Sequence, residues 1–442
     1  MGSRDGRPDA ARAPSVSFDG LWDGLLPVGR DPATGGYRRF AWTEADLECR
    51  AWFADAAAER GLDVETDGNG NLWASWGDLS AGDALVVGSH LDSVPDGGAF
   101  DGPLGVVSAF AALDAVRERG LTATRPIAIA AFSDEEGARF GVACAGSRLL
   151  VEALEADRAR ALRDGDDTTM ADAMRAAGHD PSRVGADQER LARIGCFVEL
   201  HIEQGRARPV DVGASTPRND DPHGLVDLDA PVGVASAIWP HGRWRFEFAG
   251  RADHAGTTRL EDRDDPMLSY ATAVLAARDA AMRHGALATF GKVRVLPNGV
   301  NAIPSHVTAW LDARGADEAR VRAAVSDLSG LGRLPHRRTH PRDLTGAGVF
   351  VSEESWSPAT DFDVPLRDRL GALLGGAPVL PTGAGHDAGV LAAAGVPSAM
   401  LFVRNHTGVS HSPHEHADRD DCLAGVEALA RVIEDLAGQA ET

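Results

Sequence analysis

Histidine and acidic residues follow the ends of four apolar runs in this sequence. They are His90, Glu135, Glu136, His201 and His411. Imidazole and carboxylate groups are the ligands that divalent metal ions take in proteins. One more acidic residue, Asp101, lies in a glycine-rich loop, from which a single carboxylate can bridge two ions about 3.5–4 Å apart. These residue types at these positions predict a dinuclear metal centre.

Each of these residues also has an ordinary structural explanation. A histidine at a strand end is more often a surface or hydrogen-bonding residue than a ligand, and a run such as Asp134–Glu136 is usually a solvated loop. Asp101 could simply accept backbone hydrogen bonds in its turn. We favour the metal centre because four separate runs place such residues at equivalent positions.

The apolar runs are the elements that must position these side chains. As predicted strands they are Ala84–Val87, Pro126–Phe132, Cys196–Leu200 and Val396–Val403. Residues 103–119 and 138–164 are predicted helices between the first three strands. Strand, helix and strand at this spacing favour a mainly parallel sheet with helices on both faces. Because ligand sites of such sheets lie at the carboxyl ends of the strands, we expect the histidines and glutamates at one edge.

A different pattern follows in the middle of the chain. Residues 213–230 are rich in Pro, Gly, Asp and Asn, as in a linker or an exposed loop. A βαββα unit is predicted beyond them, from strand Trp244–Ala249 to helix Asp317–Leu328, and a strand at Gly346–Ser352 could close it. We therefore expect an α/β catalytic domain interrupted by an inserted α+β domain. The predicted segments are 18–213 (catalytic), 214–356 (inserted) and 357–442 (catalytic).

Composition excludes several other classes of protein. The 442 residues are 43% hydrophobic and 25% charged, as in an ordinary globular enzyme. A formal net charge of −22 argues against nucleic acid or an anionic membrane as a partner. No apolar stretch approaches the ~20 residues that span a bilayer, and the N-terminus lacks the apolar core of a secretion signal. The four cysteines form no CxxC pair, so we expect a soluble cytoplasmic protein with reduced thiols.

Seven segments of the sequence together resemble one enzyme family. They are GSHLDSVPDGGAFDGPLGV, SDEEGARFG, ELHIEQG, GRADHAGTTRLEDRDDP, PNGVNAIPSHVTAWLDAR, PTGAGHDAG and GVSHSPHEH. In this order they are similar to the motifs of the allantoate amidohydrolase and N-carbamoyl-L-amino-acid amidohydrolase branch of the dinuclear metallopeptidase-like hydrolases. The resemblance extends from about residue 36 to the C-terminus. It is highly specific for the family and much less specific for the substrate.

The resemblance implies a role for each metal-binding candidate. His90, Asp101 and His201 would hold one divalent ion. The second ion would be held by Asp101, Glu136 and His411, with Asp101 bridging the two. The residue pattern alone already predicts ligands at these positions. Zinc, manganese and cobalt all accept mixed histidine and carboxylate ligands, so the identity of the two ions stays open.

Three residues receive catalytic roles from the same resemblance. Glu135 would be the general base for the attacking water, and Asp92 would orient the imidazole of His90. His254 would reach the tetrahedral oxyanion from the inserted domain of a second subunit. The resemblance therefore also implies a homodimer built through the inserted domain, which would serve as both lid and dimerisation domain.

Four more residues are assigned to the substrate by the resemblance. Asn301 and Arg314 would hold its carboxylate, and a guanidinium suits this task because it can make two parallel hydrogen bonds. Gln204 would contact the ureido group, and His386 would belong to the wall of the site. Without the resemblance, Arg314 would be interpreted as a surface charge at a strand end.

The substrate that the resemblance implies is a small ureido acid. The leading hypothesis is hydrolysis of allantoate with release of ammonia and carbon dioxide. The alternative is an N-carbamoyl-L-amino acid, or a related β-ureidopropionate or ureidoglycolate, and no residue separates these securely. A peptidase or an aminoacylase fits less well, because the relatives associated with those activities space the first histidine and the bridging aspartate much further apart than the eleven positions between His90 and Asp101. A non-catalytic metal-binding scaffold is an alternative of another class, against which the presence of Glu135 argues.

Two features depart from the family pattern. Arg259 stands where the family usually has proline, after the second threonine of HAGTT. The polar stretch Ala214–Asp229 is additional to the usual passage from HIEQG to the inserted domain. Both lie near the expected lid, so they bear on the identity of the substrate more than on the mechanism.

Overall fold

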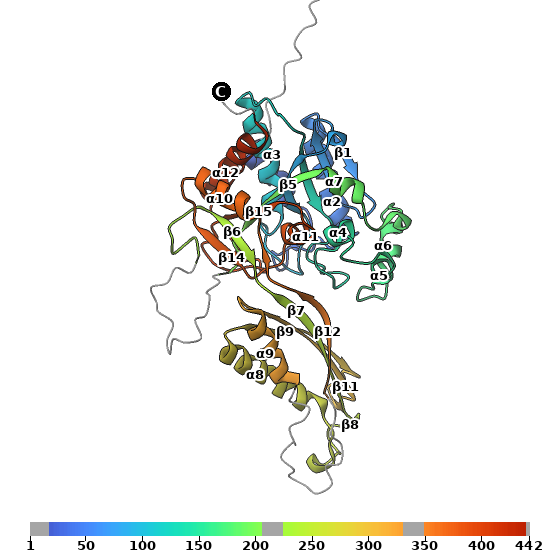
Figure 1. Cartoon of the computed structure of the whole chain (residues 1–442). Coiled ribbons are helices and arrows are strands. Elements are labelled where there is room, and N and C mark those ends of the chain that lie inside the picture. The colour runs from blue at the N-terminus through green and yellow to red at the C-terminus, as the bar shows by residue number, and fades with distance from the viewer. Residues whose placement is uncertain (1–16, 206–223, 330–348, 439–442) are drawn as a thin grey trace, which may run out of the picture.

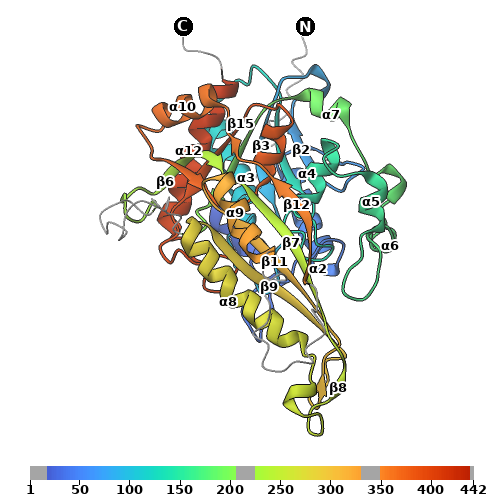
Figure 2. The ribbon, with the colours of Figure 1, turned by 60° about the horizontal axis from the view of Figure 1, so that its bottom comes forward.

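The computed structural model of this chain describes residues 17–205, 224–329 and 349–438. Within these residues a nine-stranded sheet and a four-stranded sheet form the two main parts of the molecule. The four-stranded sheet projects from the larger part, as Figures 1 and 2 show. Strands β7 (His241–Ala249) and β12 (Val349–Ser357) connect the two parts of the chain at this junction.

The nine-stranded sheet places its parallel strands at the centre. In spatial order its strands are β1 (Asp63–Thr66), β2 (Leu72–Trp76), β4 (Ile127–Phe132), β3 (Ala84–His90), β5 (Ile194–Ile202), β15 (Ser398–Val403), β6 (Val232–Ile238) and β13 (Thr360–Asp361), with β14 (Val379–Thr382) also paired to β6. Strands β4, β3, β5 and β15 run parallel, and every residue of β3, β4 and β15 is buried. Such strands need apolar residues on both faces, which explains why they read as continuous apolar runs.

Helices cover both faces of this sheet. Helices α3 (Pro103–Glu118) and α12 (Arg419–Ala437) pack on one face, whereas α11 (Asp387–Ala393) and α4 (Ala145–Leu150) contribute to the core on the other. The other α-helices of the described residues outside the small sheet are α1 (Phe18–Leu25), α2 (Glu44–Glu59), α5 (Ala156–Ala161), α6 (Met170–Ala176), α7 (Gln188–Arg193) and α10 (Val364–Leu373). The predicted fold, a mainly parallel sheet flanked by helices, is confirmed.

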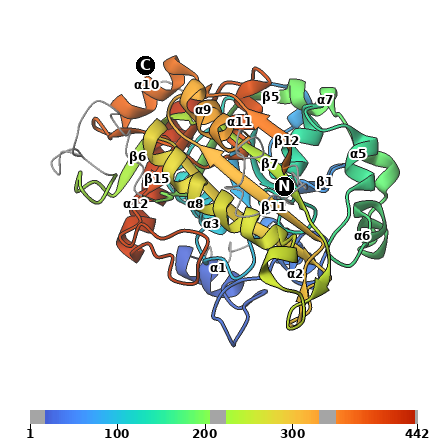
Figure 3. The same ribbon diagram turned by 90° about the horizontal axis from the view of Figure 1, so that it is seen from below.

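The four-stranded sheet is antiparallel and has one helical layer. Its strand order is β12, β7, β11 (His306–Arg314) and β9 (Leu287–Leu296). Helices α8 (Pro266–His284) and α9 (Glu318–Ser329) lie side by side across one face, as Figures 1 and 3 show. Buried and partly exposed residues alternate along β11, as expected for a strand with one covered face. The short strands β8 (Asp253–His254) and β10 (Ala302–Ile303) pair with each other at the far tip.

The structure differs from the sequence-based expectations in two places. The continuous helix predicted over 138–164 is wrong, because the chain forms α4 and α5 there, separated by Glu152 in a left-handed conformation. Strand β6 falls inside the range 214–356 predicted for the inserted domain, yet it pairs with β15 of the large sheet. The polar stretch at 213–230 lies largely outside the described residues. None of the described helices combines the length and hydropathy that crossing a membrane requires.

Candidate active site

Two histidines at the carboxyl edge of the large sheet face one carboxylate. His90 ends β3, His201 lies one residue before the end of β5, and both side chains are fully buried. The Nε2 atoms of His90 and His201 lie 3.5 Å and 3.2 Å from Oδ1 of Asp101. Gly102 permits this close approach, since a Cβ there would lie 2.4 Å from the ring of His90. The structure thus brings together the three residues predicted to hold one ion.

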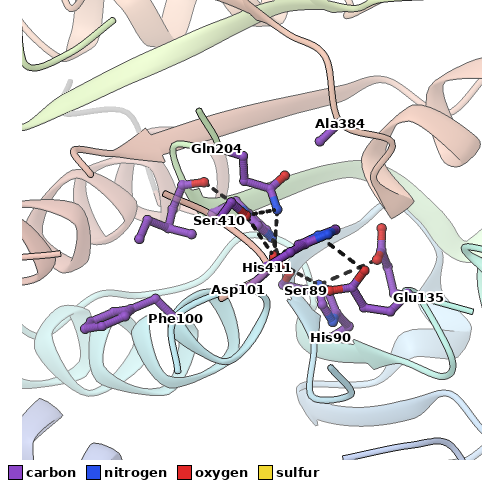
Figure 4. Close-up of polar contacts among 12 residues, drawn as sticks. Ser89, His90, Phe100, Asp101, Glu135, Gln204, Ala384, Ser410 and His411 are labelled. Carbon is purple, nitrogen blue, oxygen red and sulfur yellow. Dashed lines mark hydrogen bonds and ion pairs between the residues drawn. The ribbon is translucent and has the colours of Figure 1, made fainter. Parts of the chain in front are cut away.

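The other oxygen of Asp101 faces a second group of side chains. Nε2 of His411 lies 3.4 Å from Oδ2 of Asp101 and 3.6 Å from Oε2 of Glu136. Figure 4 shows His411 and Gln204 beside Asp101. One carboxylate therefore presents a different oxygen to each group, which is the arrangement that a bridging ligand needs.

Several atoms of these groups have no hydrogen-bond partner among the described residues. Nε2 of His90, Nε2 of His201 and Oε1 of Glu136 are buried and unpartnered. A buried polar atom without a partner costs about 1–3 kcal/mol, so such atoms in a native protein need an explanation. Imidazole nitrogens and carboxylate oxygens are the donors that zinc, manganese and cobalt accept. The side chains present therefore fit a pair of divalent metal ions.

Carboxyl groups crowd this end of the site. Burial, together with the charge of Asp101, raises the pKa of Glu136 to about 7. Burial also raises the pKa of Glu135 well above its ordinary value, although the charge of His90 opposes the shift. Bound divalent cations would offset the repulsion among these groups.

Asp92 connects His90 to the acidic pair. Its two carboxylate oxygens accept the backbone N–H groups of Glu135 at 3.1 Å and of Glu136 at 3.0 Å. Its Oδ1 also lies 3.4 Å from Nδ1 of His90. The residue therefore contacts the histidine and the backbone of both glutamates, which is the position that an orienting residue requires.

Glu135 stands next to the two candidate metal-binding groups without belonging to either. Its Oε2 lies 3.7 Å from Nε2 of His90, and its Oε1 accepts a hydrogen bond from the thiol of Cys144 at 3.4 Å. Sequence reasoning missed Cys144, which lies nine residues beyond the glutamate in a left-handed backbone conformation. No local pattern marks it, because only the turn before α4 brings the thiol back to the carboxylate.

A second residue that sequence reasoning missed is Glu415. Its Oε2 accepts the backbone N–H groups of Phe100 and Asp101, at 3.1 Å and 3.0 Å. Burial, with the neighbouring charge of Asp101, raises the pKa of Glu415 to about 7. The glutamate therefore holds the loop that carries the shared carboxylate, and its place four residues after His411 was the available signal.

A cavity of about 230 Å³ opens onto this cluster and extends toward the four-stranded sheet. Gln204 lines it, and its Nε2 donates to Oδ2 of Asp101 at 2.7 Å and to Oγ of Ser410 at 3.2 Å. His386 also lines it, with its ring centroid 4.5 Å from that of His201. Burial lowers the pKa of His386 well below its ordinary value, and the nearby His201 adds to this effect, so the imidazole is neutral. Arg314 reaches the same cavity from the end of β11.

The remaining two predicted residues are exposed and lie away from this cavity. His254 is in β8 and Asn301 precedes β10, which are paired at the far tip of the small sheet. Strand β11 has nine residues, so its two ends are roughly 26 Å apart at about 3.3 Å per residue. Arg314 stands at one end and Asn301 lies beyond the other. The expectation that Asn301 and Arg314 hold one carboxylate is therefore not met within a single chain.

The bridging role expected of Asp101 leads to a prediction. Asp101→Asn should lower both the metal content and kcat, because the amide offers one neutral oxygen where the carboxylate presents two charged ones. Metal content after dialysis and kcat under saturating substrate measure the two effects. Asp96→Asn is the matched control, since Asp96 is only partly buried nearby and pairs with Arg38. Full metal content with a normal kcat in Asp101→Asn would remove this residue from the centre.

Comparisons with known proteins show the family of this chain. Residues 86–435 match the Peptidase family M20/M25/M40. The chain is 36% identical over 430 residues to the N-carbamoyl-L-amino acid amidohydrolase of Geobacillus stearothermophilus, covering 96% of this chain and 99% of that protein. It is 30% identical over 426 residues to the allantoate amidohydrolase of Escherichia coli, covering 94% and 96%.

A solved structure resembles the whole chain as well. It is an amidase of the hydantoinase/carbamoylase family from Burkholderia vietnamiensis, with a TM-score of 0.82 and 26% identity, covering 98% of this chain and 99% of that one. The match therefore includes both sheets and not the large one alone. On these grounds the protein is a member of the Peptidase family M20/M25/M40, in its branch of amidohydrolases that act on carbon–nitrogen bonds other than peptide bonds.

Proposed function

We propose that this enzyme hydrolyses the ureido carbon–nitrogen bond of a small ureido acid with the help of two divalent metal ions. The observation that carries the proposal is the shared carboxylate of Asp101. One oxygen faces His90 and His201, and the other faces His411 beside Glu136, at the end of a cavity that Glu135 also lines. This placement supports two ions, one bridging ligand and one free acidic group beside them.

The residues of the chain divide the reaction between them. Zinc, manganese or cobalt held by these ligands would supply Lewis acidity for the scissile carbonyl and for a water nucleophile near neutral pH. Glu135 accepts the proton of the attacking water and passes it to the leaving nitrogen. Gln204 meets the ureido group, and Arg314 meets the carboxylate of the substrate from the other side of the cavity. His386, neutral and buried, lines the wall between them.

The lining of the cavity favours one of the two candidate substrates. Beyond the acidic cluster its wall includes apolar side chains, such as Ile238 of β6, Trp356 of β12, Pro358 just after β12, and Val390 and Ala393 of α11. Allantoate carries a second ureido group, whose burial against such a wall would leave hydrogen bonds unmade. An N-carbamoyl-L-amino acid with an apolar side chain would instead bury apolar surface there. We therefore place this class first and allantoate second.

A substrate panel tests this assignment. Metal-reconstituted enzyme should release ammonia from N-carbamoyl-L-leucine with a higher kcat/KM than from allantoate or N-carbamoylglycine. The reason is the apolar area that only the leucine side chain buries. Acetylated leucine serves as the control for the ureido group. Ammonia release from none of the ureido compounds would contradict the proposed reaction, and a clear preference for allantoate would reverse the order of the two substrates.

The small sheet offers a surface for a second copy of the chain. Helix α8 exposes Leu268 and Leu275 at 69% each and Met282 at 64%, at intervals of seven residues along one side. Leu287 of β9 is 57% exposed, and β9 is an edge strand in the described part of the sheet. Exposed apolar rows and open strand edges are features of association surfaces. We propose a homodimer through α8 and β9, in which His254 and Asn301 serve the site of the other subunit.

A further inference from the structure

The end of β11 carries an aspartate and an arginine at the edge of the cavity. Asp312 and Arg314 are two residues apart on this strand, so their side chains lie on the same face of the sheet. Opposite them on β7 stand Arg243 and His241. Arg314, Arg243 and His241 all line the cavity, whereas Asp312 contacts it through Arg314.

Asp312 occupies one side of the Arg314 guanidinium. The Nε atom of Arg314 donates to Oδ1 of Asp312 at 2.7 Å, and Nη2 donates to Oδ2 at 2.6 Å. Nη1 donates to the carbonyl of Gly383 at 2.8 Å. A guanidinium has five N–H donors, and these contacts use three of them. Two N–H groups therefore have no partner among the described residues, one on each terminal nitrogen. A single carboxylate can accept two such hydrogen bonds.

These contacts connect two walls of the cavity. Gly383 belongs to the loop that leads to His386, so the arginine joins the end of the small sheet to the loop of the large one. Burial opposes ionisation of Asp312, but the hydrogen bonds and charge of Arg314 outweigh it and lower the pKa of the aspartate. Asp312 is therefore an anion at neutral pH and a fixed partner for the arginine.

The wall around this pair keeps an excess of positive charge. Arg148, Arg243 and Arg314 line the cavity, and Asp312 contacts Arg314 at 2.6 Å and Arg243 at 3.8 Å. Arg148 donates to the carbonyl of Ala143 and the hydroxyl of Ser357. One aspartate does not neutralise three guanidinium groups, so an anionic part of a substrate is still attracted to this wall.

We propose that Asp312 is a positioning residue for substrate binding: it holds Arg314 so that the two remaining N–H groups bind the substrate carboxylate. This inference rests on the proposed hydrolysis of a ureido acid and adds the residue that prepares its carboxylate site. The alternative is that Asp312 competes with the substrate carboxylate for Arg314. In that case Asp312 would weaken substrate binding, and removing its charge would strengthen it.

The experiment compares an acid with its amide. N-carbamoyl-L-leucine and its carboxamide share every group except the carboxylate, and both are assayed with wild type and Asp312→Asn. In Asp312→Asn we expect KM for the acid to rise about tenfold. Arg314 is then no longer held in place, and its hydrogen-bonded contact with the substrate carboxylate is lost. KM for the carboxamide, kcat for both compounds and the metal content should stay within about twofold, because the amide does not use the charged fork.

Two further variants define the controls. Asp435→Asn of α12 removes another aspartate from an arginine, Arg369 of α10, and should leave both KM values unchanged. Asp312→Glu keeps the charge on a longer side chain and should raise KM for the acid less than Asp312→Asn does. Thermal melting would reveal whether Asp312→Asn fails to fold. In that case Asp312→Glu replaces it as the test, and an unchanged KM for the acid in Asp312→Glu would overturn the inference.

The outcomes separate this inference from the proposed function. If wild type hydrolyses the acid and Asp312→Asn leaves its KM unchanged, lowers it, or raises acid and amide alike, the positioning role is overturned while the reaction stands. If wild type hydrolyses neither compound nor any other ureido acid, the proposed function fails and the inference falls with it. A rise confined to the acid supports both.

Discussion

Glu135→Gln is expected to lower kcat by about 10²–10⁴-fold while the enzyme keeps its metal ions. The amide is nearly isosteric with the carboxylate but cannot accept the proton of the attacking water. Glu135 belongs to neither metal-binding group, and its oxygens face His90 and the thiol of Cys144. Saturation kinetics and metal analysis of the same preparation measure the two quantities.

The neighbouring glutamate provides the matched control. Glu136→Gln makes the same chemical change one residue later, in a side chain 3.6 Å from His411 within the second metal-binding group. We expect this variant to lose metal as well as activity. A loss of metal from Glu135→Gln would instead identify Glu135 as a ligand, and a normal kcat would exclude it as the base.

Mixing two inactive variants should restore activity. Glu135→Gln damages the site of its own chain, whereas His254→Ala damages the site of its partner, because His254 lies at the far tip of the small sheet. Removing one donor to an oxyanion typically costs about 10²–10³-fold in kcat. A mixed dimer has one site with both defects and one with neither, so random exchange of equal amounts should return about a quarter of the wild-type activity.

A second mixture controls for effects of exchange itself. Glu135→Gln mixed with Glu136→Gln contains no dimer with an intact site, so no activity should return. Native mass spectrometry of the mixtures reports whether subunits exchange. If mixed dimers form and the first mixture stays inactive, His254 acts in the site of its own chain or in neither site. Catalysis then does not require His254 from a second subunit.

The sequence determined where the candidate ligands lie. His90, His201 and His411 follow apolar runs, and parallel strands that are buried on both faces must be such runs. Because the carboxyl ends of these strands share one edge, residues more than 300 positions apart could be placed together from their local pattern alone. The small sheet was also predictable, since its central strands β7 and β11 alternate between a covered and an open face.

Only the tertiary structure decided which side chains complete the site. Cys144 reaches Glu135, and Glu415 reaches the backbone of Asp101, through contacts that no periodic pattern encodes. Strand β6 pairs with β15 of the large sheet. The sequence did not predict this pairing, because β15 lies in a distant part of the chain. Hydrophobic periodicity reports which face of an element is buried, but it carries no information about which element covers it.

The same limit explains the substrate residues. Asn301 and Arg314 belong to one sequence motif, yet the whole of β11 extends between them and keeps them apart. Arg314 meets Asp312 and the loop of Gly383, a contact that depends on how the two sheets are set against each other. Residue types and spacing determined the chemistry of this protein, whereas the packing of distant segments determined which groups can act on one substrate.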